Sequence, residues 1–175
     1  MIGAYALINE HHVSDQVLTP TSGEAKMQKG ECLATSVRKA SRRLTQVYDD
    51  ALAPSGLRST QFSILGELAA RSEPPTLMEL AAAMVSDRSS LGHALRPLVR
   101  GGYVTLRRGE ADRRTQRIVL TDRGHDKYRE GEAYWRVAQD AFVSLYGSEW
   151  SEALRAAVLT IAHDNRLGTM TLDAA

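Results

Sequence analysis

Apolar residues recur along the chain at two spacings, and these spacings predict a set of helices and one hairpin. From Leu33 onward they advance by threes and fours while arginine and lysine take the other side, a pattern typical of an amphipathic helix. Its apolar positions are Leu33, Val37, Ala40, Leu44, Val47 and Ala51. Because Pro54 and Gly56 interrupt the pattern, we expect one long helix that ends near them.

Two shorter helices are predicted next, on either side of a proline pair. Ser59 or Thr60 can cap the first, and Pro74-Pro75 breaks the chain behind it. Thr76 and Glu79, three residues apart, then form a capping box that opens the second. The residues expected to face inward are Phe62, Leu65, Leu68, Leu77, Leu80, Ala81 and Met84.

A tight turn separates this short helix from a fourth. Asp87 can cap a helix over residues 88–100, which Gly101-Gly102 ends. One face of that helix carries Leu91, Leu95 and Leu98. The opposite face carries Ser89, His93, Arg96 and Arg100. The two helices and the turn between them predict a helix-turn-helix.

The spacing then changes from the helical period to alternation. Residues 103–106 and 115–120 have the alternation and β-branched content of two strands. Between them lies a loop with Gly109 near its tip and the arginines Arg107, Arg108, Arg113 and Arg114. A hairpin at this place makes the helix-turn-helix a winged one.

Two further helices are expected after the hairpin. Thr121 can cap a long one that ends at Gly147, and Ser148 can cap the next. Together their apolar positions exceed what one small core needs, which indicates dimerisation. These positions are Tyr128, Trp135, Ala138, Phe142, Leu145, Trp150, Leu154, Ala157, Val158 and Ile161.

The predicted fold class is therefore mainly α with a small β-hairpin wing, a winged helix-turn-helix flanked by long N- and C-terminal dimerisation helices. We expect an N-terminal extension, a dimerisation helix, the winged helix-turn-helix domain, a second set of dimerisation helices and a C-terminal tail. Their ranges are 1–28, 29–58, 59–120, 121–167 and 168–175, respectively.

Charge is concentrated in the winged part. The 175 residues carry a net charge of only +1, which alone gives no reason to expect nucleic acid. Residues 88–129, however, contain 11 basic and 4 acidic side chains, a net of +7, so the remainder carries −6. A basic segment thus covers the fourth helix and the hairpin.

These features predict binding to double-stranded DNA, because a helix fits the major groove and arginines on a hairpin can reach the minor groove or the phosphates. Gly92 would let the helix lie close to the groove. The residues expected to read bases or phosphates are Arg88, Ser89, Ser90, His93 and Arg96 on the helix, with Arg108, Arg113 and Arg114 on the wing.

The segment DRSSLGHALRPLVRGGYVTLRRGEADRRTQRIVLTDRG, with its D-x-R wing and L-T-x-x-G end, resembles the MarR family. The segment ECLATSVRKASRRLTQVYDDALAPSGLRSTQFSIL resembles the first two helices of that family. The resemblance implies a winged-helix homodimer joined through its first and last two helices, which binds near-palindromic operators and usually represses. It also implies that Arg114 enters the minor groove, supported by Asp112, and that Asp87 orients this arginine.

The resemblance also suggests two ways of control. Many relatives respond to small aromatic or phenolic ligands bound between the dimer helices and the DNA-binding lobe, where Tyr48, Phe62 and Trp135 are candidates; ordinary core aromatics are the alternative. One branch senses organic peroxide through a cysteine near the start of its first helix. Cys32 lies in that neighbourhood, but its spacing to Tyr48 is two residues longer and would put Ala34 at the sensing position.

Other classes of function have little support in the sequence. It contains no glycine-rich phosphate loop, no G-x-S-x-G and no H-E-x-x-H, so no enzyme and no cofactor is expected. His11-His12 and His125 with Asp126 do not make a metal-ligand set. Without a membrane-spanning run or signal peptide we expect a cytoplasmic protein. A winged helix used only for protein contacts remains the main alternative.

Overall fold

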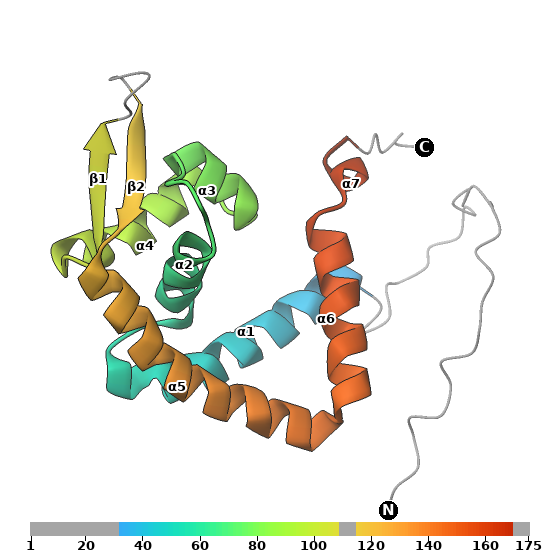
Figure 1. Ribbon diagram of the computed structural model, residues 1–175. Coiled ribbons are helices and arrows are strands. Elements are labelled where there is room, and N and C mark those ends of the chain that lie inside the picture. The colour runs from blue at the N-terminus through green and yellow to red at the C-terminus, as the bar shows by residue number, and fades with distance from the viewer. Residues whose placement is uncertain (1–31, 109–114, 170–175) are drawn as a thin grey trace, which may run out of the picture.

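The computed structural model describes residues 32–108 and 115–169. Helices α2, α3 and α4 and a two-stranded hairpin form one lobe, and α5 runs from the base of the hairpin past α1 to α6 (Figure 1). This confirms the predicted winged helix-turn-helix with long flanking helices. The elements are α1 (Leu33–Leu52), the 3-10 turn η1 (Ala53–Ser55), α2 (Ser59–Ala69), α3 (Leu77–Ala83), α4 (Arg88–Arg100), β1 (Val104–Arg108), β2 (Gln116–Leu120), α5 (Asp122–Tyr146), α6 (Ser148–Ala162) and α7 (Asn165–Thr169).

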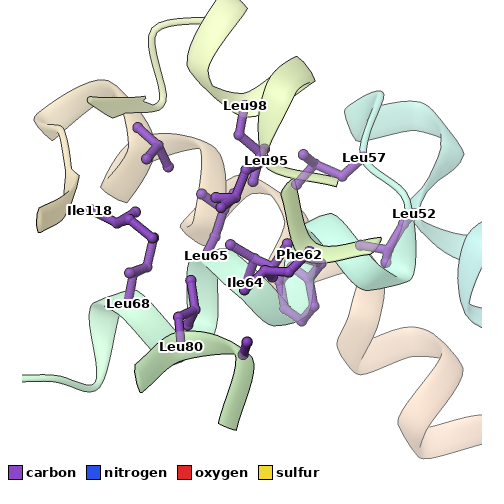
Figure 2. Packing of buried hydrophobic residues seen from close by; sticks show 13 residues of the cluster. Leu52, Leu57, Phe62, Ile64, Leu65, Leu68, Leu80, Leu95, Leu98 and Ile118 are labelled. Atoms are coloured by element: carbon purple, nitrogen blue, oxygen red, sulfur yellow. The ribbon is translucent and has the colours of Figure 1, made fainter. Parts of the chain in front are cut away.

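The core of the lobe is made by leucine and isoleucine side chains from the helices and the hairpin (Figure 2). On α4, Leu91, Leu95 and Leu98 are 2%, 6% and 1% exposed, so the predicted inward face is confirmed. Burying such a side chain contributes roughly 2 kcal/mol. Because three of them anchor α4, the helix continues through Pro97 and its opposite face is held outward.

Local caps begin three of the helices as predicted. Thr76 caps α3 in a capping box with Glu79, whose carboxylate accepts the Thr76 N–H at 2.7 Å. The Asp87 carboxylate accepts the Ser90 N–H at 2.8 Å at the start of α4. The Thr121 hydroxyl accepts the Gly124 N–H at 3.0 Å at the start of α5. The turn and the hairpin therefore enter their neighbouring helices at fixed angles.

Two predicted caps were wrong. Ser59 is the first residue of α2 rather than its cap, and its N–H donates to the Asp49 carboxylate of α1 at 2.7 Å. Ser148 is likewise the first residue of α6, and the preceding Gly147 is the cap, with φ of 85°. In α2 a carboxylate ten residues earlier takes the place of the local hydroxyl. The short elements η1 and α7 were not predicted, and α7 crosses the expected start of the tail at residue 168.

The hairpin is fastened to the lobe at its base and along one edge. Strands β1 and β2 pair antiparallel, with Val104 opposite Leu120 and Arg108 opposite Gln116. The Ile118 N–H donates to the Pro75 carbonyl at 2.8 Å, so the segment before α3 borders β2. The Thr121 hydroxyl donates to the Gly102 carbonyl at 2.8 Å. The wing therefore projects from the same rigid lobe that holds α4.

The long flanking helices are poorly covered by the rest of the described chain. Leu52 is the one buried residue of α1, and Ser151 is the one buried residue of α6. Among their apolar side chains Leu33 is 68% exposed and Ile161 is 47% exposed. No helix among the described residues has both the length and the apolar character needed to cross a membrane.

Candidate nucleic-acid interface

The first turn of α4 presents polar groups to solvent. Arg88, Ser89 and Ser90 are all exposed, directly after the cap Asp87. Hydrogen bonds from the Ser90 hydroxyl and the Ser90 N–H lower the pKa of the Asp87 carboxyl, which therefore stays ionised as a cap. Because Asp87 already accepts the Ser90 N–H, the groups left to donate to a phosphate oxygen are the Arg88 guanidinium and the serine hydroxyls.

Farther along α4 the exposed face carries His93 and Arg96. The Arg96 guanidinium lies 3.4 Å from the His93 ring nitrogen Nδ1, so the two side chains form one polar group. Gly92 lies beside them, and a Cβ placed there would meet nothing within 4 Å. Arg100 continues the exposed face. The helix therefore offers donors over about three turns and has open space above them, as insertion into a major groove requires.

A groove separates α4 from the hairpin. It has a volume of about 620 Å³, and its walls include Gly92, Arg96 and Arg100 from α4 and Leu106 and Gln116 from the hairpin. Arg96 and Arg100 bring positive charge to the α4 wall of this groove.

The wing itself is described only in part. Arg107 and Arg108 end β1 and are exposed. Asp112, Arg113 and Arg114 fall within residues 109–114, outside the described part of the chain. Their expected roles, and that of Asp87 in orienting Arg114, therefore stay predictions.

One contact near the wing was missed at the level of sequence. The Arg117 guanidinium of β2 donates to the Glu79 carboxylate of α3 at 3.0 Å and to the Pro74 carbonyl at 3.1 Å. Sequence patterns gave Glu79 a capping role and counted Arg117 only as a basic residue. Nothing local could have paired them, because they are separated by 38 residues.

A second, larger cavity of about 970 Å³ lies between α1, α2, α5 and α6. Tyr48, Phe62 and Trp135, the three candidate ligand contacts, all line it. The Phe62 ring stacks on Trp135 with 6.1 Å between centroids, and the Tyr48 hydroxyl donates to Gln139 Oε1 at 2.7 Å. Burial raises the pKa of Tyr48, which keeps its phenol neutral. The cavity is apolar and aromatic, with hydroxyl groups at its wall.

Cys32 stands at the start of α1, partly exposed and not in a disulfide. The hydroxyl of Thr35 hydrogen bonds to the thiol and lowers the pKa of Cys32 below the ordinary thiol value. Within residues 32–108 and 115–169 there is no group of three or more potential metal ligands.

Comparison with known proteins identifies a family and solved structures that are similar to this chain. A family model described as MarR family matches residues 55–115. A search of curated proteins gave no significant match. The M. tuberculosis transcriptional regulator MosR, in a structure with DNA, is 33% identical, with 80% of this chain and 100% of MosR covered and a TM-score of 0.69.

The transcriptional repressor CouR, whose source is Rhodococcus jostii, is a second similar structure. Bound to a 23-mer DNA duplex, it is 26% identical, with 76% of this chain and 94% of CouR covered and a TM-score of 0.69. CouR bound to p-coumaroyl-CoA aligns at 24% identity and a TM-score of 0.68 over 81% of this chain and 99% of CouR, which shows the fold alone. From the family match and the identity to MosR, the chain belongs to the MarR family of transcriptional regulators.

Proposed function

We propose that this protein is a sequence-specific DNA-binding transcriptional repressor that works as a homodimer. The observation that carries the proposal is the exposed polar face of α4, from Ser89 to Arg100, on a helix whose other face is fixed in the core. The DNA complexes of MosR and CouR support the same use of the fold. In this proposal helix 88–100 reads the major groove and residues 107–114 enter the minor groove.

The dimer follows from the open faces of α1 and α6. Each helix has one buried residue, and helices of 20 and 15 residues need a packed face to be stable in water. A second copy with the same open faces would cover them in a two-fold arrangement. A two-fold dimer matches a near-palindromic operator, because each recognition helix reads one half-site.

We propose a small aromatic or phenolic effector for the cavity lined by Tyr48, Phe62 and Trp135. The stacked rings supply flat apolar contacts, and the neutral Tyr48 hydroxyl can hydrogen bond to a phenol or carboxyl group. Because the cavity joins the flanking helices to the lobe, an occupant would bias the distance between the two α4 helices of a dimer. Oxidation of Cys32 is a second candidate signal, favoured by its partly exposed thiol of lowered pKa.

The proposal involves no catalysis, and it implies a cytoplasmic protein because its partner is the DNA. The test is to let the wild-type protein select duplexes from a random library. We expect an inverted repeat to be enriched. Arg96→Ala should lose this enrichment, whereas the control Arg136→Ala, which removes the same charge from α5, should keep it. A wild-type chain that enriches no sequence would refute DNA reading and favour a protein-contact role for the winged helix.

A further inference from the structure

Arg117 and Glu79 join the wing to the helix-turn-helix by side chains. Arg117 is the second residue of β2, close to where the strand leaves the wing loop. Its Nη1 donates to Glu79 Oε2 at 3.0 Å and to the Pro74 carbonyl at 3.1 Å. Glu79 is held in turn, because Oε2 also accepts the Thr76 N–H at 2.7 Å. The guanidinium therefore meets an acceptor that cannot move without breaking the cap of α3.

The pairing of the strands places a second cation next to Arg117. Arg107 on β1 lies directly opposite Arg117 on β2, so two cations share one face of the hairpin. Like charges at opposite positions of an antiparallel pair repel each other. The Glu79 carboxylate compensates Arg117 and holds it toward α3. Among the described residues no ion pair involves Arg107, which stays exposed on the wing.

The two ends of the contact are attached to the two reading elements. Glu79 belongs to α3, and the turn after α3 is closed by the Ser86 N–H, which donates to the Ala81 carbonyl at 2.9 Å. The core residues Leu80 on α3 and Leu91 on α4 belong to the same buried cluster. A shift of Glu79 relative to Arg117 is thus a shift of α4 relative to the wing.

We propose that Glu79 and Arg117 are positioning residues, which act together with the backbone hydrogen bond from Ile118 to Pro75 to set the angle of the wing relative to the recognition helix, so that both grooves are engaged at once. This inference rests on the proposed DNA-binding function. A small change of angle at the base of a hairpin moves its tip by a larger distance. The fit of the wing to DNA should therefore depend on this contact. Neither residue needs to touch DNA in this role.

One substitution distinguishes this role from a direct phosphate contact, because the two roles predict opposite changes in DNA affinity. In Glu79→Gln the amide can still cap Thr76, since glutamine serves in capping boxes, but the charge that holds Arg117 is gone. If Arg117 only contacted phosphate, freeing it would strengthen binding. As a positioning pair, we expect affinity for the selected duplex to fall about tenfold in Glu79→Gln, although the protein gains positive charge.

Arg117→Gln should lose affinity to the same extent, and the Glu79→Gln/Arg117→Gln double variant should be no worse than either single one. Hydroxyl-radical footprints should lose protection where the wing lies, while methylation interference at major-groove guanines should persist. Arg117→Lys should restore most of the wing footprint. Each variant should melt within about 3 °C of the wild type, because an exposed ion pair contributes little to stability.

The opposite results are equally clear. Wild-type or tighter binding by Glu79→Gln, additive losses in the double variant, or equal loss of both footprints would each overturn the positioning role while leaving DNA binding intact. If the wild type itself selects no duplex, the proposed function fails first and the positioning role falls with it.

Discussion

At the scale of single residues, two glycines differ in whether the packing of the chain requires them. A Cβ on Gly124 would lie 2.1 Å from the Tyr103 carbonyl oxygen, so only glycine allows α5 to start against the base of the hairpin. The L-T-x-x-G pattern in the sequence could be noticed as a resemblance, but its cause is this contact between distant segments. Gly92, in contrast, faces open space, and nothing within the described chain requires it.

We therefore predict that Gly92→Ala and Gly124→Ala change the free energy of unfolding in opposite directions. Gly92→Ala should raise the free energy of unfolding by about 0.5–1 kcal/mol, because alanine favours a helix interior, yet weaken DNA binding where the helix meets the groove. Gly124→Ala should lower it by at least about 2 kcal/mol through a backbone clash. Urea denaturation and duplex titration of both variants test this. Unchanged DNA affinity in Gly92→Ala would contradict close approach of α4 to DNA.

At the scale of elements, local signals predicted most helix starts. Contacts between residues far apart in the chain could not be predicted from the sequence. Thr76, Asp87 and Thr121 cap their helices as expected, because a cap and its amide lie within three residues of each other. At the start of α2 the Ser59 N–H donates instead to Asp49 of α1, in addition to a local contact between the Arg58 N–H and Gln61. The pairing of Glu79 with Arg117 is remote in the same way, and so no periodicity or local motif reveals it.

Asp49→Ala should lower the free energy of unfolding by about 1 kcal/mol, because the Ser59 N–H loses its acceptor. Burial alone would raise the pKa of Asp49, but the hydrogen bonds from Ser59 and Arg58 outweigh it and lower the pKa. The stabilisation is therefore present above the ordinary value of 3.8 and is lost as the pH falls through the lower folded value.

The control for this variant is Asp50→Ala, at an exposed neighbouring position, where the change should stay within about 0.5 kcal/mol. Urea denaturation at neutral and acidic pH gives both quantities, and the gap between wild type and Asp49→Ala should narrow in acid. Equal stability of the two alanine variants at neutral pH would show that Asp49 does not support α2.

At the scale of the whole molecule, the sequence predicted the lobe well and left the surroundings of the long helices open. The leucines of α4 are buried within the same chain, so their spacing was enough to predict which face of the helix packs inward. The apolar positions of α1 and α6 were identified from sequence too, yet Leu33, Trp150 and Ile161 remain exposed in the single chain. What covers such a face depends on a partner, which the pattern of one chain does not specify.

If a second copy covers it, Ile161→Asp should convert a dimer of 19.2 kDa chains into monomers, because a charge would be buried in an apolar interface. Ala156→Asp, on the other side of α6, is the matched control and should leave the dimer intact. Sedimentation equilibrium measures both masses. We also expect Ile161→Asp to weaken operator binding, since two linked half-sites bind more tightly than one. A wild-type monomer would rule out the two-fold mode of reading.

The most direct test of the central claim, that this chain reads DNA sequence through α4, is a titration of the selected duplex against a scrambled one over a salt series. We predict tight binding to the selected duplex that weakens as salt rises, with the preference lost in Arg96→Ala and kept in Arg136→Ala. Equal affinity of the wild type for both duplexes, or a preference that survives Arg96→Ala unchanged, would contradict it.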